Sequence, residues 1–333
     1  MDSVTHIVLG ACIGEALCGQ KIGKKALLIG AIAQSIPDLD FITSFWLPPA
    51  EQLLAHRGIS HSFIFVVALS PILGYIMSKG FRRVSFQAFT LLFLIEMSTH
   101  LFLDAFNNYG VGWLEPFSHV RISFNTVYVA DVLMTIVPLI AAGVLLFTSL
   151  NNNRRQIWAR LGIAWSFVYL CFCIVNKLYI SRQVERAFEA QGIAHVRYFT
   201  TPAPLQNFLW MVVTGDEKGF YVAYRSVFDQ SPVITFTFFP SNNQLLEPIK
   251  NEEEVILLKR FSQGFYTVDQ SADTLIFNDL RFGQIIGWHD PKEQFVFHYY
   301  LRQPGNELVV QRGRFAKWDR NSIISFLRRI KGN

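Results

Sequence analysis

Long runs of apolar residues fill the first half of the chain and give way to shorter runs in the second half. A helix needs about 20 apolar residues to cross the hydrocarbon core of a bilayer. The segments that meet or approach this length are Ser62–Ser78, Phe86–Phe106, Val127–Leu150 and Leu161–Ile180. Val4–Cys18 and Lys25–Ile36 are shorter and rich in glycine and alanine, which favours a tight helical hairpin or a re-entrant pair. The pattern therefore predicts about six apolar helices.

After about residue 195 the pattern changes to short alternating segments, rich in Val, Phe, Tyr and Thr and separated by turn residues. Such segments are typical of strands. The predicted strands are Val196–Thr200, Phe208–Val213, Phe220–Ser226, Val233–Phe239, Gly264–Val268, Thr274–Asn278, Phe295–Leu301 and Glu307–Arg312. A closing helix is predicted over Asp319–Ile330, with Asp319 near its cap. The expected fold is an α-helical membrane domain, residues 1–182, followed by a β-rich soluble domain with a C-terminal helix, residues 195–333.

Basic residues are distributed unevenly among the loops between the apolar segments. Three alternate loops carry nine of them, namely Lys21, Lys24, Lys25, Lys79, Arg82, Arg83, Arg154, Arg155 and Arg160. The opposite loops, 37–61 and 107–126, carry only Arg57 and Arg121. The positive-inside rule places the nine-charge loops in the cytoplasm. We therefore expect the N-terminus, loops 37–61 and 107–126, and the C-terminal domain to be extracytoplasmic.

Composition narrows the choice of partners. The net charge of +5 does not indicate nucleic-acid binding, because no block of Lys and Arg alternates with aromatic residues. The bilayer is the expected partner, and no protein partner is indicated. The four cysteines, Cys12, Cys18, Cys171 and Cys173, lie within apolar segments, where we expect small buried hydrophobic residues rather than redox or metal groups.

Ionisable residues follow one stripe of the Phe86–Phe106 helix. Glu96, His100 and Asp104 are spaced four apart, so they lie on the same helix face. Residues four apart are separated by a rise of about 6 Å, so His100 and Asp104 could hold one ion together. Because ionisable groups are costly inside a membrane, they normally face the protein interior or a water-filled cavity.

Further His and Asp residues lie at the ends of other segments. In the six-helix topology the following residues fall at the same membrane face: His6, Asp38, Asp40, His56, His61, His100, Asp104 and Asp131. Random scatter would place about half of them at each face. Imidazole and carboxylate ligands together suit Zn²⁺, Mn²⁺ or Fe²⁺, and carboxylates can bridge two such ions. The pattern therefore favours a metal site built from several segments.

Each member of this set also has a structural interpretation. Asp38 and Asp40 could form a polar helix exit, and a single loop histidine could have no ligand role. Glu96 could be a buried, protonated hydrogen-bond partner. His119 and Asp131 remain open between a structural and a functional role. The three histidines of the strand-rich region, His195, His289 and His298, are expected to be structural.

Several motifs resemble those of a known family over residues 1–140. They are Thr5-His6, Pro37-Asp38-Leu39-Asp40, His56-Arg57-Gly58 with His61-Ser62, and His100-x-x-x-Asp104 followed by Tyr109-Gly110. These motifs resemble the YdjM family, whose members are described as inner-membrane, metal-dependent hydrolases. The resemblance implies location in a bacterial inner membrane, metal dependence and hydrolysis. The order of His and Asp residues is also similar to that of the zinc-dependent phospholipase C and P1-type nuclease group, which cleaves phosphoesters.

These observations lead to one main hypothesis, a membrane metallohydrolase acting on a lipid or lipid-linked phosphoester. One or two ions, most often zinc in such sites, would be held by His6, Asp38, His56, His61, His100 and Asp104. Arg57 could clamp a substrate phosphate, and Asp40 or Glu96 could act as a general base or orient a ligand histidine. The alternatives are a metal or proton transporter and a non-catalytic envelope scaffold stabilised by metal.

Overall fold

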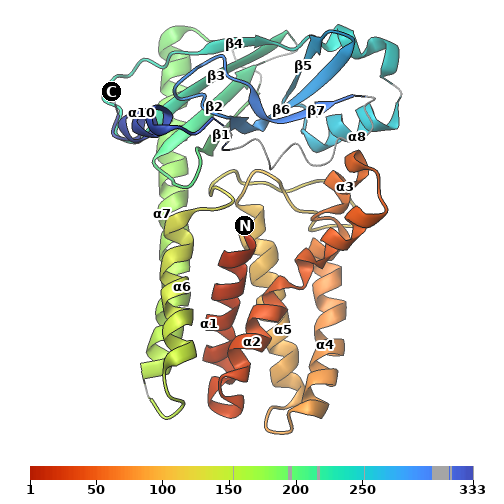
Figure 1. Cartoon of the computed structure of the whole chain (residues 1–333), viewed down its shortest axis with the longest axis vertical. Helices are drawn as coiled ribbons and strands as arrows, with labels where there is room; N and C mark the ends of the chain where they lie inside the picture. The colour runs from red at the N-terminus through yellow and green to blue at the C-terminus, as the bar shows by residue number, and fades with distance from the viewer. Residues whose placement is uncertain are drawn as a thin grey trace. The chain divides into compact units, whose positions relative to one another are not determined.

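The computed structural model describes residues 1–152, 154–193, 197–215, 218–250, 252–301, 315 and 317–332 (Figure 1). The chain divides into two compact units. The first, here called the helical unit, comprises Met1–Thr43, Ala55–Ile174 and Pro204–Gln206. The second, here called the strand unit, comprises Ser44–Leu54, Val175–Ala203 and Asn207–Asn333. The domain limits expected from sequence, 1–182 and 195–333, remain a prediction.

The first half of the chain is helical. Its elements are α1 (Ser3–Ile22), α2 (Lys25–Ser35), η1 (Pro37–Phe45), α3 (Pro49–Ala55), η2 (Ile59–His61), α4 (Phe63–Gly80), α5 (Phe86–Ala105), α6 (Val132–Phe147) and α7 (Arg154–Gln191). Four of these helices begin after a residue whose side chain accepts a hydrogen bond from a first-turn N–H group, and these caps are Asp2, Ser62, Ser85 and Asp131. Short polar side chains at that position satisfy backbone donors that otherwise lack partners.

Three described helices, α4, α5 and α7, are long and apolar enough to cross a membrane. The number rises to four if α2 and η1, which meet at a bend of 56°, form one broken span. The expected count of about six spans is therefore not confirmed. An 11-residue helix such as α2 rises only about 16 Å, roughly half the thickness of the hydrocarbon core. By length and composition, α2 and η1 are either a broken span or a re-entrant loop.

Helices α1 and α2 pack as a tight hairpin, one of the two arrangements that their small residues favour. A Cβ atom added to Gly14 would lie 2.2 Å from the Ala26 carbonyl oxygen. A Cβ atom added to Gly30 would lie 2.1 Å from the Gly10 carbonyl oxygen and 2.8 Å from Glu96 Oε1. Because real Cβ atoms do not approach other atoms so closely, Gly30 allows α1, α2 and α5 to meet at one point.

Helix α5 is the centre of the helical unit. One of its sides packs Phe89, Leu92 and Met97 with small residues of α2 and with Val66 of α4. The other side packs Leu103 against residues of α1, α6 and α7. Because α5 is buried on both sides, its three ionisable residues, Glu96, His100 and Asp104, need polar or charged partners within the protein.

Two features of the helical unit correct the sequence-based expectations. Arg155, counted among the loop cations, is buried, and its Nε and Nη2 atoms each lie 2.8 Å from a carboxylate oxygen of Glu15. Cys171 is exposed, whereas Cys12, Cys18 and Cys173 are buried as expected. A helix that packs along one side of a bundle presents its other side to the surroundings, and Cys171 lies on that side of α7.

The strand unit contains two antiparallel sheets. The first has the order β1 (Arg197–Pro202), β2 (Leu209–Gly215), β3 (Gly219–Ser226) and β4 (Thr237–Pro240). The second has the order β5 (Tyr266–Ser271), β6 (Thr274–Gln284) and β7 (Phe295–Tyr300). The remaining elements are η3 (Asn243–Ile249), α8 (Glu253–Phe261) and α10 (Arg320–Ile330). Residues Val184 and Phe188 of α7 pack on Trp210 and Val212 of β2.

Seven of the eight predicted strands overlap β1 to β7, and the eighth, Glu307–Arg312, lies outside the described residues. The predicted strand Val233–Phe239 is wrong at its start, since only Thr237–Pro240 pairs with β3. The reason is local, because the backbone N–H and C=O of Ile234 bond to the side chain of Gln191 instead of a strand. Asp319 caps α10 as predicted, and its hydrogen bonds with Ser322 hold the pKa of Asp319 below its ordinary value.

The close approach at Gly30 is testable with one methyl group. We expect Gly30→Ala to destabilise the protein by about 1–3 kcal/mol, because the methyl group meets backbone that cannot move aside. The matched control is Gly143→Ala on α6, where an added Cβ atom meets nothing within 4 Å. Alanine is the better helix former, so this control should melt at the wild-type temperature or above it. Thermal unfolding of detergent-purified protein measures both, and equal melting temperatures would contradict the packing described.

Candidate metal centre

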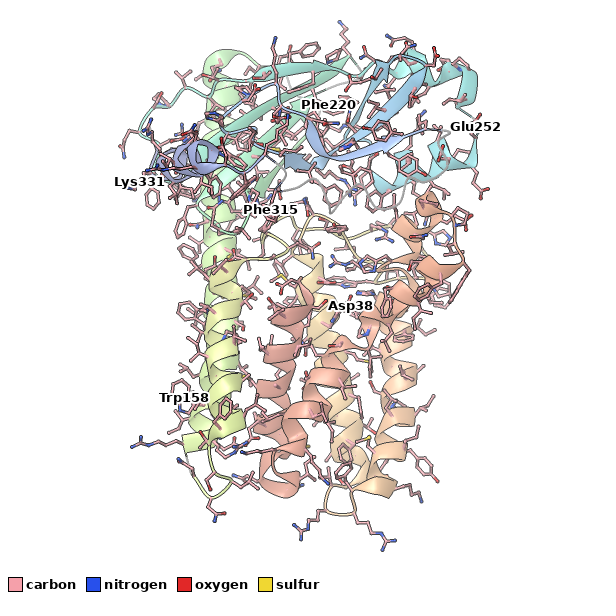
Figure 2. The ribbon with its side chains drawn as sticks, in the orientation of Figure 1. Asp38, Trp158, Phe220, Glu252, Phe315 and Lys331 are labelled. Carbon is pink, nitrogen blue, oxygen red and sulfur yellow. The ribbon has the colours of Figure 1, made fainter. Side chains whose placement is uncertain are left out.

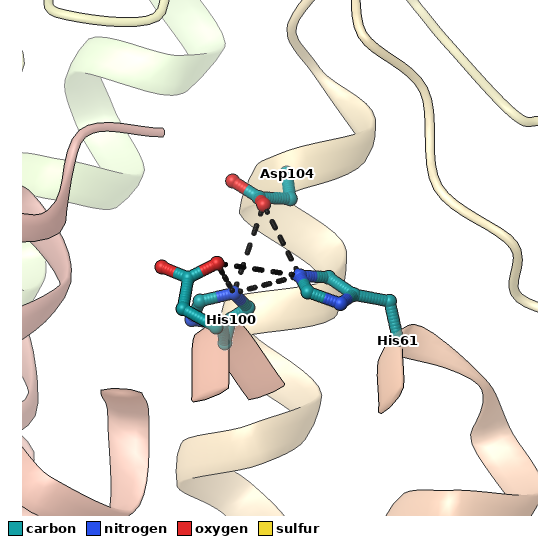
Figure 3. A group of neighbouring side chains, drawn as sticks. His61, His100 and Asp104 are labelled. Carbon is teal, nitrogen blue, oxygen red and sulfur yellow. Dashed lines mark hydrogen bonds and ion pairs between the residues drawn. The ribbon is translucent and has the colours of Figure 1, made fainter. Parts of the chain in front are cut away.

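Four side chains from three segments converge near the end of α5 (Figure 3). His100 and Asp104 lie one turn apart on α5, with 3.6 Å between His100 Nε2 and Asp104 Oδ2. His61, at the end of η2, places its Nε2 atom 3.1 Å from His100 Nε2. Asp38, from η1, places Oδ1 3.4 Å from His100 Nε2 and 3.6 Å from His61 Nε2. We call these four residues the His/Asp cluster.

The cluster is compact and mostly inaccessible to solvent. One donor atom from each member lies within 4.8 Å of the others. The side chains of His61, His100 and Asp104 are fully buried, and that of Asp38 is 23% exposed. Asp38 is therefore the member that faces the outside of the unit.

In each histidine of the cluster, Nε2 faces the cluster and Nδ1 contacts a polar group outside it. His100 Nδ1 lies 2.6 Å from the backbone carbonyl oxygen of Gln34. Because a carbonyl only accepts, Nδ1 carries the proton and Nε2 presents a lone pair to the cluster. His61 Nδ1 lies 3.0 Å from Ser60 Oγ and 3.4 Å from Asp40 Oδ2, and the nearby carboxylate favours the same tautomer. This is how metal-ligating histidines are oriented in proteins.

The donor set fits a divalent metal ion. In this tautomer two imidazole lone pairs and two carboxylates face one another in a buried space, which is unfavourable unless positive charge lies between them. Asp104 Oδ2 is buried and accepts no hydrogen bond of good geometry from the described residues. Two nitrogen and two oxygen ligands from His and Asp are typical of zinc, manganese and iron sites.

Asp40 lies behind the cluster and organises the loop that carries His61. Its Oδ2 atom accepts hydrogen bonds of 2.8 Å from the backbone N–H of Arg57 and from Ser60 Oγ. Its Oδ1 atom lies 2.8 Å from His56 Nδ1. Of the two roles expected for Asp40, orienting a ligand histidine agrees with these contacts better than that of a general base facing the cluster.

His6 and His56 flank the cluster and are not among its four members. His6 Nε2 lies 3.2 Å from Asp104 Oδ1, the carboxylate oxygen on the other side from His61, and its ring stacks on His100 with centroids 3.8 Å apart. The buried α-amino group of Met1 pairs with the same oxygen, and burial lowers the pKa of this amine. The side chain of His56 is 39% exposed, and its ring centroid lies 6.2 Å from that of His61.

Arg57 is buried beside the cluster. Its Nε atom lies 3.0 Å from Asp104 Oδ2, and its Nη1 atom donates to Asn107 Oδ1 at 2.8 Å. The guanidinium group also lies over the ring of Tyr109, 4.9 Å from its centroid. These contacts fix the position of Asp104, and the expected clamp on a substrate phosphate stays a prediction.

Glu96 lies one turn deeper on α5 and is fully buried. With its amide nitrogen turned toward α5, the side chain of Gln34 donates to the Glu96 carboxyl group. Gln34 thus contacts both Glu96 and, through its backbone, His100. Sequence reasoning identified Glu96 and missed Gln34, because the contact to His100 comes from a backbone carbonyl that no residue type signals.

Asp131 and His119, whose roles the sequence leaves open, both contact other residues outside the His/Asp cluster. Asp131 caps α6, accepting from the N–H groups of Leu133 and Met134, and lies 2.9 Å from the Tyr169 hydroxyl. His119 is exposed and bonds to Glu115 at 2.7 Å. In the strand unit, His298 Nδ1 bonds to the backbone of its own strand, and His195 lies outside the described residues.

Comparisons with known proteins include a match to the part of the chain that carries this centre. A family model described as YdjM inner membrane protein matches residues 1–180. The inner membrane protein YbcI of Escherichia coli is 28% identical over 120 residues, which is 35% of this chain and 69% of that protein. The uncharacterized protein YfhP of Bacillus subtilis is 29% identical over 138 residues, which is 39% of this chain and 42% of that protein.

No solved structure matches the chain. The family model includes every member of the His/Asp cluster and ends within α7, so it covers the helical unit almost completely. Residues 1–180 are more than half of the 333 residues. The chain therefore belongs to the YdjM family of inner membrane proteins.

Proposed function

We propose that this protein is a membrane-bound, metal-dependent hydrolase that cleaves a phosphoester of a lipid or lipid-linked substrate at the outer membrane face. The observation that carries the proposal is the His/Asp cluster, in which two imidazole nitrogens and two carboxylate oxygens meet at the end of a candidate membrane span. Such a ligand set is the usual basis of metal-assisted hydrolysis.

The proposed ligands of one ion are Asp38, His61, His100 and Asp104. Asp104 directs its other oxygen toward His6, so a second ion beside the first would use His6 and share Asp104. Zinc suits this mixture of nitrogen and oxygen donors best, with manganese or iron as alternatives. His56, the remaining proposed ligand, lies on the solvent side of Asp40.

A bound divalent ion would lower the pKa of a water molecule and stabilise charge on phosphoryl oxygens. The chain's own residues supply the rest. Gln34 and Asp40 fix the rings of His100 and His61, and Arg57 fixes Asp104. Asp38 is the accessible member, so the substrate would approach from its side. Fixed ligands matter because a misplacement of about 1 Å can cost a hundredfold in rate.

The substrate class follows from the surroundings of Asp38. Leu39 and Phe41 alternate with Asp38 and Asp40 along η1, and their exposed fractions are 52% and 55%. Exposed apolar side chains next to a polar site at a helix end favour a substrate with a headgroup and a hydrocarbon chain. A lipid phosphoester has this form.

A metal or proton transporter, the main alternative, would need polar groups across the bilayer. Glu96 extends the polar chain of His100 and Gln34 by one turn. Below Glu96, the buried side chains of α5 are Phe93, Leu92 and Phe89. Glu15 lies in another part of the unit and is occupied by Arg155. These positions favour a site at one face over a path through the membrane.

Metal content is the first test. We expect detergent-purified wild type to hold about one or two transition-metal ions per chain, and His100→Ala/Asp104→Ala to hold none, because both α5 ligands are removed. His119→Ala is the matched control, since His119 is an exposed histidine that bonds to Glu115 outside the cluster. Inductively coupled plasma mass spectrometry provides the counts. A folded wild type that binds no metal even after reconstitution would exclude the metallohydrolase.

A substitution at Asp40 tests whether this residue is a metal ligand or supports a ligand histidine. We expect Asp40→Asn to weaken metal affinity about 10- to 100-fold while the saturated stoichiometry stays at the wild-type value, as is typical when the group behind a ligand histidine is lost. Competition with a chelator of known affinity measures the change. Loss of a whole equivalent of metal would instead make Asp40 a ligand, and unchanged affinity would remove it from the site.

Hydrolysis itself is tested with phospholipids and lipid phosphates in mixed micelles. We expect wild type to release product, metal-stripped wild type to lose the activity and regain it on adding metal, and folded His100→Ala/Asp104→Ala to be inactive. Full activity in the folded double variant would refute the proposed site. If metal removal unfolds the protein and no substrate is turned over, the centre is structural and the scaffold alternative stands.

A further inference from the structure

A concavity lies at the opposite end of the helical unit from the His/Asp cluster. It is an open pocket of about 720 Å³, formed where the α1–α2, α4–α5 and α6–α7 connections come together. These three connections lie at the same end of the unit in Figure 1. Figure 2 shows Asp38 near one end of this unit and Trp158 of α7 near the other. Along α5, the rise from Phe86 to Asp104 is about 27 Å, close to the thickness of a hydrocarbon core.

The pocket is lined by four cations from two of these connections. Lys21 and Lys25 come from the α1–α2 connection, and Arg82 and Arg83 come from the α4–α5 connection. All four are exposed, so their charges are available to a ligand from solvent or from the membrane surface. Lysine contributes a compact charge, whereas arginine offers a planar pair of donors that matches two phosphate oxygens.

Among the described residues that line this pocket, none carries a carboxylate. The sequence between Glu15 and Asp38 contains no acidic residue. Between Asp40 and Glu96, the sequence contains only one, Glu51. Glu15, the acidic residue nearest to the α1–α2 connection in sequence, is buried and fully engaged by Arg155. Within the described lining, the four positive charges therefore have no acidic neighbour, which leaves them available to an anionic ligand.

The pocket also has apolar walls. Ile22, Phe81 and Leu150 line it beside the cations, and Lys25 Nζ lies 5.5 Å from the centroid of the Phe81 ring. The pocket lies at the ends of the apolar helices and has both polar and apolar walls. At this depth of a bilayer the phosphates of lipid headgroups meet the hydrocarbon chains. The positive-inside rule accounts for cations in these loops, but it does not require them to line one concavity.

We propose that this pocket binds the phosphate-bearing headgroup of an anionic phospholipid. Basic pockets between membrane helices are known to recognise such headgroups. Lys21, Lys25, Arg82 and Arg83 would contact the phosphate, and the apolar walls would contact the start of an acyl chain. This site is separate from the proposed hydrolytic centre and does not depend on it.

The experiment is native mass spectrometry of the detergent-purified full chain, titrated with phosphatidylglycerol or phosphatidylcholine. We expect wild type to prefer phosphatidylglycerol, and Arg82→Gln/Arg83→Gln to bind it about 30-fold more weakly, equivalent to about 2 kcal/mol for two cations. The matched control is Arg154→Gln/Arg160→Gln, which removes the same charge from exposed positions outside the pocket lining and should keep the preference. Thermal unfolding checks that both double variants remain folded.

Three results would overturn the proposal. One is a wild type without preference for phosphatidylglycerol, and another is an equal loss in both double variants, which would indicate general attraction to a basic surface. The third is displacement of phosphatidylglycerol by millimolar inorganic phosphate at matched ionic strength, which would make the pocket a site for a soluble anion. Metal content and hydrolysis should be the same in wild type and Arg82→Gln/Arg83→Gln when both are measured in neutral detergent.

Discussion

The cost of burying ionisable groups on a membrane helix is the constraint that organises the helical unit. Helix α5 carries Glu96, His100 and Asp104 along one stripe, and all three are fully buried. The neighbouring segments supply partners for each of them. Gln34 of α2 contacts Glu96 and His100, and Arg57 of the following loop contacts Asp104. Gly30 lets α2 come close enough to α5 for these contacts, so helix packing and the chemistry of the site depend on the same glycine.

The same logic explains why the cluster depends on residues that are not among its own members. Two imidazoles present lone pairs to a common space only if their other nitrogens are held, and Asp40, Ser60 and the Gln34 carbonyl do this. Asp40 also bonds to the backbone of Arg57, which adopts a left-handed conformation with φ of 60°. The loop before α4 is therefore shaped around one carboxylate, which lies behind the cluster and contacts it through the outer ring nitrogen of His61.

Spacing along the chain predicted the parts of the site that lie on a regular helix. Residues four apart on α5 had to share a face, and the topology brought Asp38 and His61 to the same end. The sequence could not predict that His6 and His56 flank the cluster. The stacking of His6 on His100 and the contact of His56 with Asp40 depend on tertiary packing. Likewise, alternation predicted β2, β3 and β7, but nothing in the pattern showed that Gln191 would take the hydrogen bonds of Ile234.

An apolar helix, α4, lies in the chain between the first two segments that supply the cluster and the third. Asp38 and His61 precede α4, whereas His100 and Asp104 follow it on α5. During synthesis the donor set is therefore incomplete until α5 has entered the membrane, and earlier intermediates expose only a partial site. Under the proposed function, a chain assembled in this order would acquire its ion after insertion, from the aqueous compartment next to the finished cluster. The metal supply of that compartment, as much as the chemistry of the ligands, would then decide which ion the protein carries.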